Sequence, residues 1–262
     1  MPELPEVERA RRLLEDRCVG RYVASVNAAN DAIVFCGAVA GAFAALAGRR
    51  VLEVGRRGKL FFLRFDRPPA LVCHFGMTGN IQFANEAPLQ YRRSGKTYTG
   101  AEAWPPRFCK LTMRLTSSTT ADDADDKECV TWAFTDPRRL GRIRLIDDPL
   151  GQPPISELGF DPFITMPALD VFAAGVRRRR MPIKALLLDQ KFSAGVGNWI
   201  ADEVLYQSRL HPGRLTGSLN DEEMTALHQQ LRSVCETACA VNADANQFPT
   251  DWLFHRRWGK GR

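Results

Sequence analysis

Long apolar runs are missing from this sequence of 262 residues. No stretch approaches the roughly 18 consecutive apolar residues that a membrane-spanning helix needs. The alanine-rich run at 37–47 is shorter and contains glycine, so we expect it to form a helix within a core. The first residues also lack the layout of a secretory signal peptide. We therefore expect an intracellular protein without a membrane partner, located in the nucleus if the organism is eukaryotic.

Paired cysteine motifs are missing as well. The seven cysteines are scattered and include no CxxC pair. An odd number with irregular spacing favours reduced thiols over a disulfide framework. Cys235 and Cys239 lie one helical turn apart with His228 upstream, but a zinc site there would lack a fourth ligand. We therefore expect buried cysteines on a helix face, no metal and no cofactor.

The net charge is only mildly positive, at +6. This balance suits a polyanionic partner, although many ordinary enzymes share it. The hydrophobic fraction of 45% is sufficient for one large core or two modest ones.

The periodicity of apolar residues changes along the chain. A helical pattern at 5–18 is followed by short runs of β-branched and aromatic residues between turn residues, which predict an antiparallel sandwich. The expected strands are 22–26, 51–54, 60–65, 71–73, 111–115, 130–134 and 143–146. The small, polar and acidic segment at 116–128 predicts an exposed hairpin loop.

Proline and glycine gather at 147–162, and helical spacing follows. Residues 218–221 have the spacing of a capping box, ahead of an apolar stripe that runs from 224 to 241. The predicted fold class is α+β, with an N-terminal helix plus antiparallel β-sandwich and then a helical domain. The expected boundaries are 1–148 for the sandwich domain, 149–165 for the linker and 166–262 for the helical domain.

The first eight residues, Met1-Pro2-Glu3-Leu4-Pro5-Glu6-Val7-Glu8, carry the strongest chemical signal. Removal of Met1 would expose the secondary amine of Pro2. A terminal amine has a pKa of about 7.7–8, so part of it is unprotonated and nucleophilic at neutral pH. Glu3 and Glu6 would supply two carboxylates for acid–base work or for orienting the nucleophile. The alternative is an ordinary helix start, with Pro5 in the first turn and glutamates at the positive end of the helix dipole.

This octapeptide resembles the N-terminus of the formamidopyrimidine-DNA glycosylase family, whose members remove oxidised bases from DNA and cut the strand. The resemblance implies that Pro2 is the nucleophile and Glu3 the acid/base of a bifunctional glycosylase and AP lyase. A second segment, 184–212, resembles the helix-two-turn-helix of the same family. Its glycine-bracketed turn at 195–198 leads into a helix start that can bind a phosphate. We expect Asn198 to cap that helix and contact the DNA backbone, with Lys184 as a helper.

The resemblance also implies contacts to double-stranded DNA from the predicted sandwich. Lys59 matches a phosphate-contacting lysine, which we group with Pro2, Glu3 and Glu6 as catalytic. His74 matches a histidine that grips the backbone. The run of four arginines at 177–180 is either a solvated charge run or a nonspecific backbone contact.

An enzyme that acts on a base inside a duplex must extrude it and fill the gap. The resemblance implies that Met77 is the wedge and that Arg138 faces the orphaned base. Leu140 stands where bacterial members commonly have phenylalanine, which predicts altered interrogation of the lesion.

The likeness fails beyond about residue 258. Bacterial members finish with a four-cysteine zinc finger. The segment 248–255 instead resembles the plant and fungal branch, in which a zinc-less hairpin replaces the finger, but this sequence shows neither finger nor hairpin before residue 262. We therefore expect the finger to be absent, and we place His255 at the position of a phosphate-contacting tyrosine. The connection at 241–247 is shorter than the bacterial loop that covers flipped 8-oxoguanine.

The expected function is base-excision repair of DNA that carries oxidised purines or abasic sites. We expect formamidopyrimidines to be preferred over 8-oxoguanine, with strand cleavage by β- and δ-elimination and a monomeric protein. The alternative is a non-catalytic protein that binds damaged DNA.

Overall fold

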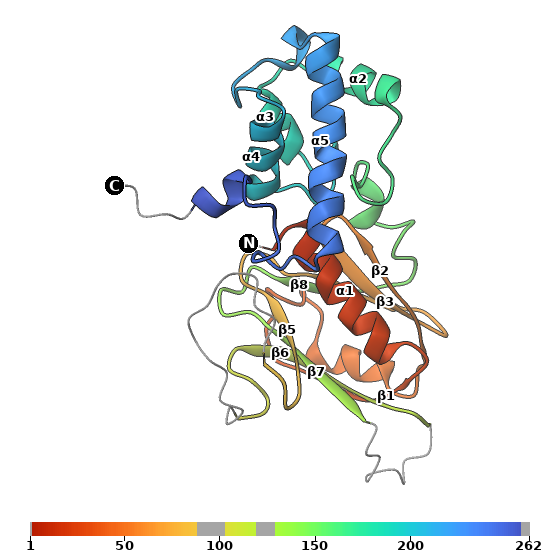
Figure 1. The fold of residues 1–262 in the computed structure, drawn as a ribbon. Helices are drawn as coiled ribbons and strands as arrows, with labels where there is room; N and C mark the ends of the chain where they lie inside the picture. The colour runs from red at the N-terminus through yellow and green to blue at the C-terminus, as the bar shows by residue number, and fades with distance from the viewer. Residues whose placement is uncertain (1, 88–102, 119–128, 258–262) are drawn as a thin grey trace. The chain divides into compact units, whose positions relative to one another are not determined.

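The computed structural model describes residues 2–87, 103–118 and 129–257, which form two compact units (Figure 1). Unit one comprises Met1–Pro2 and Val7–Ser156, and unit two comprises Glu3–Glu6 and Glu157–Arg262. Helix α1 (Leu4–Cys18) therefore contributes its first residues to unit two and the remainder to unit one. The predicted hairpin loop at 116–128 falls largely outside the described residues.

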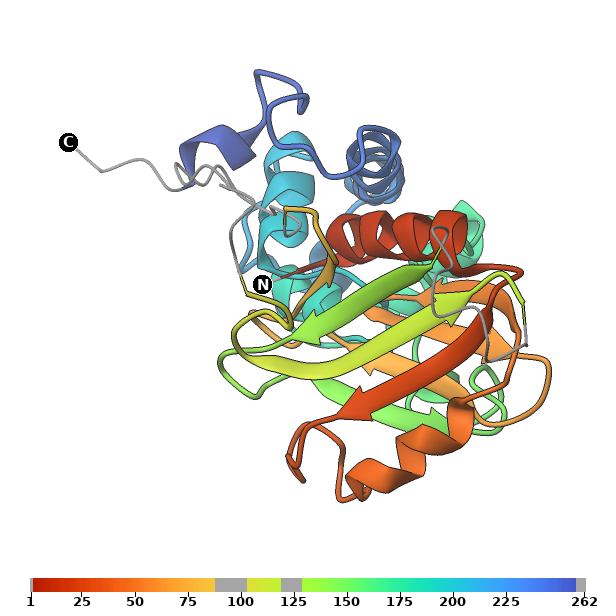
Figure 2. The ribbon, with the colours of Figure 1, turned by 90° about the horizontal axis from the view of Figure 1, so that it is seen from below.

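Unit one contains two four-stranded antiparallel sheets in its described part, and Figure 2 shows them stacked face to face. One sheet has the order β1-β6-β7-β5 and the other β2-β3-β4-β8. The first sheet consists of β1 (Tyr22–Ala28), β6 (Cys109–Thr116), β7 (Val130–Thr135) and β5 (Asn80–Phe83). The second consists of β2 (Val51–Arg57), β3 (Leu60–Phe65), β4 (Ala70–His74) and β8 (Arg142–Ile146).

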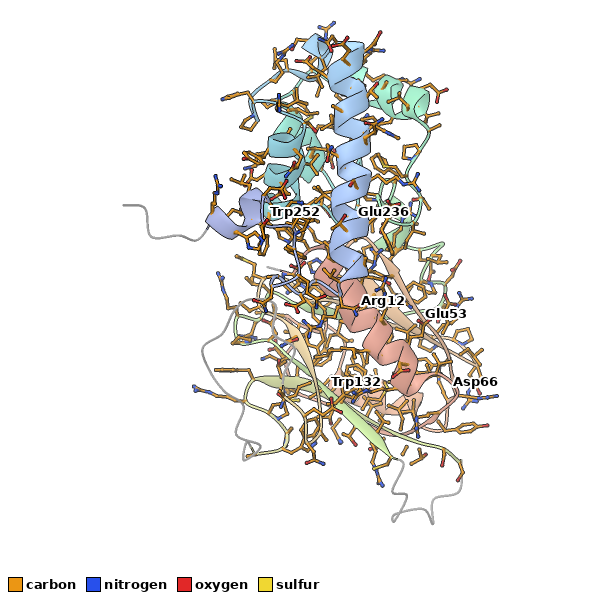
Figure 3. All side chains as sticks on the ribbon, viewed as in Figure 1. Arg12, Glu53, Asp66, Trp132, Glu236 and Trp252 are labelled. Atoms are coloured by element: carbon orange, nitrogen blue, oxygen red, sulfur yellow. The ribbon has the colours of Figure 1, made fainter. Side chains whose placement is uncertain are left out.

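The core of unit one lies between the two sheets and helix α1. Val7, Ala10 and Leu14 recur at helical spacing and are fully buried in this core. Trp132 of β7, which Figure 3 labels, is also fully buried. Buried and half-buried positions alternate along 110–115 of β6, as expected for a strand with one face toward a sandwich core.

Strand β5 was not predicted, because it is only four residues long and two of them, Asn80 and Gln82, are polar. The alanine-rich run forms the expected helix against the core, as a 3-10 helix, η1 (Ala40–Leu46). It buries only Phe43 and Leu46, since its small side chains offer little apolar surface to the core.

Unit two is helical. Its α-helices are α2 (Leu169–Arg177), α3 (Ile183–Leu188), α4 (Asn198–Gln207) and α5 (Asp221–Ala240), and short 3-10 turns η2 (Ile155–Glu157), η3 (Thr216–Ser218) and η4 (Leu253–Arg256) accompany them. Helix α4 packs against both α5 and α3 (Figure 1). The apolar stripe of α5 is buried as expected, including both of its cysteines, and the ring of His228 lies 2.8 Å from the carbonyl of Pro167.

The cap of α5 differs from the prediction. The capping box is formed by Asn220 and Glu223, two residues later than the Ser218–Asp221 pair. The Asn220 side chain accepts from the Glu223 amide at 2.8 Å, and the Glu223 carboxylate accepts from the Asn220 amide at 2.9 Å. Ser218 is occupied elsewhere, because its hydroxyl donates to the Leu215 carbonyl. None of the described helices has the length and apolarity required to cross a membrane.

An aromatic cluster holds η4 in unit two. The rings of Phe248 and Phe254 lie 4.8 Å apart, and Trp199 and Trp252 (Figure 3) complete the cluster. The buried carboxylate of Glu203 on α4 accepts from the amides of residues 253 and 254, at 3.2 Å and 2.8 Å. The packing of these rings fixes η4 on α4. The hydrogen bonds from the first amides of η4 to Glu203 contribute to the same attachment.

Candidate functional site

The carboxylate of Glu3 lies at the N-terminus of helix α4. It is almost completely buried, with 2% of its surface exposed. It accepts hydrogen bonds from the backbone amides of Gly197, Trp199 and Ile200, at 2.8, 2.9 and 3.2 Å. The start of a helix leaves these amides without partners and carries a partial positive charge, so both effects stabilise a carboxylate there. Glu3 is therefore held in one orientation by the helical unit.

The turn before α4 is shaped to receive this carboxylate. A Cβ atom on Gly197 would lie 2.3 Å from Cδ of Glu3, so only glycine allows the approach. The side chain of Gln190 fixes the turn, because it accepts from the Gly195 amide at 3.0 Å and donates to the Val196 carbonyl at 2.8 Å. The amide of Leu4 also donates to the Gly195 carbonyl, at 3.1 Å.

The expectation that Asn198 caps α4 is corrected. Asn198 is the first residue of the helix, Gly197 occupies the position before it, and the cap is supplied by Glu3 from a distant part of the sequence. The cap could not be recognised from local spacing, because the partners are separated by almost two hundred residues. The side chain of Asn198 is exposed, and its phosphate contact remains a prediction.

Glu6 supports Glu3 from the first turn of α1. Its side chain is buried and accepts a hydrogen bond from the Glu3 amide at 2.9 Å. Burial and the neighbouring charge of Glu3 raise the pKa of Glu6 to about 7. Pro2 precedes Glu3 directly, so the N-terminal segment joins the expected nucleophile to a carboxylate of fixed orientation.

Lys184 and Asn198 are brought together by an acidic neighbour that the sequence did not suggest. Asp202, on α4, binds Lys184 at 2.6 Å and also pairs with Arg257. Arg257 donates in addition to the backbone carbonyl of Asn198 at 3.2 Å. Burial alone would raise the pKa of Asp202, but the hydrogen bonds from Lys184 and Arg257 bring it below its ordinary value. A carboxylate therefore lies beside Lys184 and close to Asn198, the two residues of this unit that the resemblance connects with DNA binding.

Lys59 lies in the two-residue turn between β2 and β3. Gly58 adopts the left-handed conformation that the turn requires, with φ of +58°. The buried guanidinium of Arg56 donates to the Gly58 carbonyl at 2.9 Å and to the Glu8 carboxylate at 2.9 Å. Burial would raise the pKa of Glu8, but Arg11 and Arg56 hold it below its usual value. The turn of Lys59 is thus fixed to α1 by a buried ion pair.

His74 ends strand β4 in the same unit as Lys59. Its Nδ1 atom accepts the amide hydrogen of Gly76 at 3.0 Å, which assigns the ring proton to Nε2. Burial, together with the charge of Lys59 and of two nearby arginines, lowers the pKa of His74 to about 4. At neutral pH the ring is therefore an uncharged donor through Nε2, which suits a hydrogen bond to a phosphate oxygen.

Met77, Arg138 and Leu140 lie on two turns of unit one and are all exposed. The first turn joins β4 to β5, and the second joins β7 to β8. Their expected insertion into DNA remains a prediction.

The remaining cationic candidates make contacts within unit two. The ring of His255 lies 3.0 Å from the Pro249 carbonyl, inside its own chain segment. Arg177 pairs with Asp221, and Arg179 donates to the Gly175 carbonyl at 2.7 Å while its guanidinium lies over the ring of Phe192. Half of the four-arginine run is therefore engaged within unit two.

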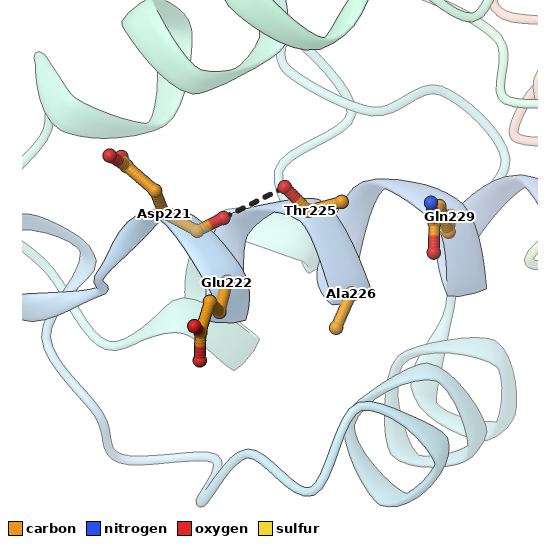
Figure 4. A pocket seen from close by; sticks show the side chains of 5 residues that line it. All are labelled: Asp221, Glu222, Thr225, Ala226 and Gln229. Atoms are coloured by element: carbon orange, nitrogen blue, oxygen red, sulfur yellow. Dashed lines mark hydrogen bonds between the residues drawn. The ribbon is translucent and has the colours of Figure 1, made fainter.

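A shallow hollow lies beside the first turns of α5, lined by Asp221, Glu222, Thr225, Ala226 and Gln229 (Figure 4). The Thr225 hydroxyl donates to the Asp221 carbonyl at 2.8 Å. Two acidic side chains in its wall make this hollow unsuitable for a phosphate.

Several residues of the site could not be found from the sequence, chiefly Arg56, Gln190 and Asp202. Each acts by holding a turn or a cation, and each is an ordinary charged or polar residue without a spacing rule. Only Arg56 stood next to a predicted contact, in the basic turn that carries Lys59.

The fold and the N-terminal segment define a protein built from an N-terminal helix, a two-sheet sandwich and a helical unit that binds a carboxylate at a helix start. Residues 1–143 match the family model for the formamidopyrimidine-DNA glycosylase N-terminal domain, and residues 158–250 match the model for the H2TH domain of that glycosylase. The chain belongs to the formamidopyrimidine-DNA glycosylase family. The predicted α+β fold class, with a helix-two-turn-helix in its helical part, is confirmed.

Named relatives agree with this membership. A formamidopyrimidine-DNA glycosylase of Arabidopsis thaliana is 40% identical over 258 residues, which cover 98% of this chain and 63% of the relative. The chain therefore spans less than two thirds of the length of that relative. The enzyme of the same name from Heliobacterium modesticaldum is 35% identical over 90% of this chain and 78% of its own length.

Solved structures give the same result. The Lactococcus lactis Fpg in complex with DNA that contains N7-benzyl-Fapy-dG has a TM-score of 0.74 and 26% identity, covering 91% of this chain and 79% of the other. The complex of the same protein with DNA that contains an abasic site has a TM-score of 0.74 and 25% identity, covering 91% and 78%.

Proposed function

We propose that this protein is a bifunctional DNA glycosylase and AP lyase of base-excision repair, acting on DNA with oxidised purines or abasic sites. The observation that carries the proposal is the Glu3 carboxylate, fixed by three amides at the start of α4 and joined directly to Pro2. Membership of the family supports it, as do the solved relatives in complex with damaged DNA.

The chemistry begins at the Pro2 nitrogen after removal of Met1. The nitrogen lone pair forms a bond to C1′ of the extruded nucleotide while the bond from C1′ to the base breaks, and the base leaves with a proton. Opening of the sugar ring gives a cationic iminium that acidifies the protons at C2′. Loss of one such proton expels the 3′ phosphate, and a second elimination expels the 5′ phosphate. Glu3 donates and accepts the protons in these steps, and Glu6 orients Glu3.

Substrate contacts are proposed for both units. Lys59 and the Nε2–H group of His74 bind backbone phosphates from the sandwich, and Lys184 and Asn198 do so from the helical unit. His255 contacts the DNA backbone from η4. The proposed location is the intracellular compartment that holds the DNA, the nucleus in a eukaryote.

The segment at 241–247 bears on the choice of lesion. It forms a compact turn, in which the amide of Ala243 donates to the Ala238 carbonyl at 2.8 Å and that of Gln247 to the Asp244 carbonyl at 2.9 Å. Ala243 is buried in this turn. A turn closed on itself cannot extend over a flipped base, so we propose that formamidopyrimidines and abasic sites are preferred over 8-oxoguanine.

Single-turnover rates on three duplexes test the proposal. The expected order is fast cleavage at an abasic site, excision of formamidopyrimidine opposite cytosine, and little excision of 8-oxoguanine opposite cytosine. Glu3→Gln should slow excision of formamidopyrimidine by at least about 10²-fold, because proton transfer is lost. Binding of damaged DNA without cleavage of any of the three would favour a non-catalytic binding protein instead.

A further inference from the structure

One buried carboxylate holds both of the turns that carry Met77, Arg138 and Leu140. Asp136 is fully buried, at 0% exposure. One of its oxygens accepts from the Thr78 hydroxyl at 3.0 Å and from the Arg138 amide at 3.2 Å. The other accepts from the Gly141 amide at 2.6 Å. A carboxylate in such a place requires these donors, because an uncompensated buried charge is costly.

The donors come from two different parts of the chain. Thr78 follows Met77 in the turn after β4, whereas the amides of Arg138 and Gly141 lie on either side of Leu140 in the turn before β8. The same side chain therefore sets the position of both turns.

The two turns also touch through their backbones. Gly76 has a φ of +60°, and a Cβ atom there would lie 2.4 Å from the carbonyl carbon of Leu140 and 2.5 Å from its oxygen. Only glycine accommodates both the conformation and this approach. The peptide before Met77 is thus packed on the peptide of Leu140.

Arg139, between Arg138 and Leu140, is held by a second carboxylate, that of Asp31. Its guanidinium donates two hydrogen bonds to Asp31, both at 2.9 Å, and Lys110 binds the same carboxylate at 2.9 Å. Arg139 itself adopts the left-handed conformation, with φ of +58°. The bidentate pair therefore fixes the backbone from which Arg138 and Leu140 project.

We propose that Thr78 and Asp136 are positioning residues that couple Met77 to Arg138 and Leu140, so that the two turns enter the DNA duplex as a single wedge. The inference rests on the proposed function, which supplies the DNA. Two independent turns would each lose conformational freedom on insertion, and this cost would slow base extrusion. A shared buried anchor removes that loss before the DNA arrives.

Thr78→Val tests the anchor, because it removes the hydroxyl and keeps the shape of the side chain. Excision of formamidopyrimidine from a duplex should fall about tenfold, while cleavage of single-stranded abasic DNA, which has no base pair to open, should stay within about twofold. Thr78→Ser keeps the hydroxyl and should restore the duplex rate. Thr131→Val in strand β7 controls for loss of a threonine hydroxyl elsewhere in unit one and should behave as wild type. Equal loss on both substrates, or none on either, overturns the proposal.

A mutant cycle measures the coupling itself. In the wild-type background, Met77→Ala and Leu140→Ala should combine to less than the product of their separate effects on duplex excision, because each disables the same wedge. In the Thr78→Val background the effects should multiply. The same non-additivity in both backgrounds contradicts the proposed coupling.

Amide hydrogen exchange in the free protein separates this inference from the proposed function. Thr78→Val should accelerate exchange in the turn at 76–79 and in the turn at 138–141 together. Faster exchange in both turns, with no cleavage of any DNA by the wild type, would uphold the structural coupling and refute the activity. Exchange that changes only at 76–79 refutes the coupling, whatever the activity.

Discussion

At the scale of single residues, the buried carboxyl group of Glu6 makes the stability of the protein depend on pH. Burial and the charge of Glu3 raise its pKa to about 7 in the folded protein, whereas an unfolded chain keeps the ordinary value of 4.5. Between these two values the folded state holds a proton that the unfolded state has lost. Stability therefore falls as the pH rises from about 4.5 to about 7, and it is constant above that range with respect to this group.

The variant Glu6→Gln isolates this contribution. The wild type should lose up to about 3 kcal/mol of unfolding free energy relative to Glu6→Gln between pH 4.5 and pH 7.5, from about 1.4 kcal/mol per pKa unit. Denaturant unfolding of both proteins at the two pH values measures the difference. A difference that does not vary with pH would show that Glu6 is ionised in the folded protein.

The sequence predicted the roles of individual residues more fully than it predicted the hydrogen-bond partners that hold those residues in place. Pro2 and Glu3 could be recognised because they are adjacent in a short, specific motif. The partners of Glu3 could not, since the amides of Gly197, Trp199 and Ile200 reach it only after the helical unit has folded. The resemblance names the residues, and long-range hydrogen bonds set their geometry.

At the scale of elements, the turn before α4 depends on one glycine. Gly197→Ala would place a Cβ atom 2.3 Å from Cδ of Glu3, so either the carboxylate or the helix start must move. We expect a loss of about 1–3 kcal/mol of stability, as for other overpacked sites, together with slower cleavage of abasic DNA. Thermal unfolding and single-turnover cleavage measure the two effects.

Gly217→Ala is the matched control for this substitution. It lies in the same unit, and a Cβ atom there would meet nothing within 4 Å. It should leave both stability and cleavage close to those of the wild type. Equal behaviour of the two variants would show that the approach of Glu3 to Gly197 is not required.

Most strands and long helices could be predicted from hydrophobic periodicity, because each buries a face large enough to produce regularly spaced apolar residues in the sequence. Helix α5 and strand β3 are examples, with an apolar stripe and a nearly continuous buried run. Strand β5 left no such pattern, because it is short and half of its residues are polar. The cap of α5 was displaced by two residues because Ser218 and Asn220 are both competent caps, and only tertiary contacts choose between them.

At the scale of the whole molecule, binding to DNA should depend on salt through the phosphate contacts. Lys59→Ala removes one contact, so affinity should fall alike for all sequences and the slope of log affinity against log salt should decrease by about one. Arg232→Ala removes a cation that pairs with Glu236 on α5, and it should leave the slope unchanged. A salt titration on an abasic duplex compares the three proteins. An unchanged slope for Lys59→Ala would remove Lys59 from the contacts.

The account as a whole depends on covalent chemistry at Pro2, and reduction of the intermediate tests this most directly. Protein whose Met1 has been removed should be captured on abasic DNA by sodium borohydride, because the iminium between Pro2 and C1′ is reduced to a stable amine. Pro2→Gly keeps a primary amine and should be captured less. Protein that retains a residue ahead of Pro2 should not be captured at all, and capture of that blocked protein with the efficiency of the free one would contradict the account.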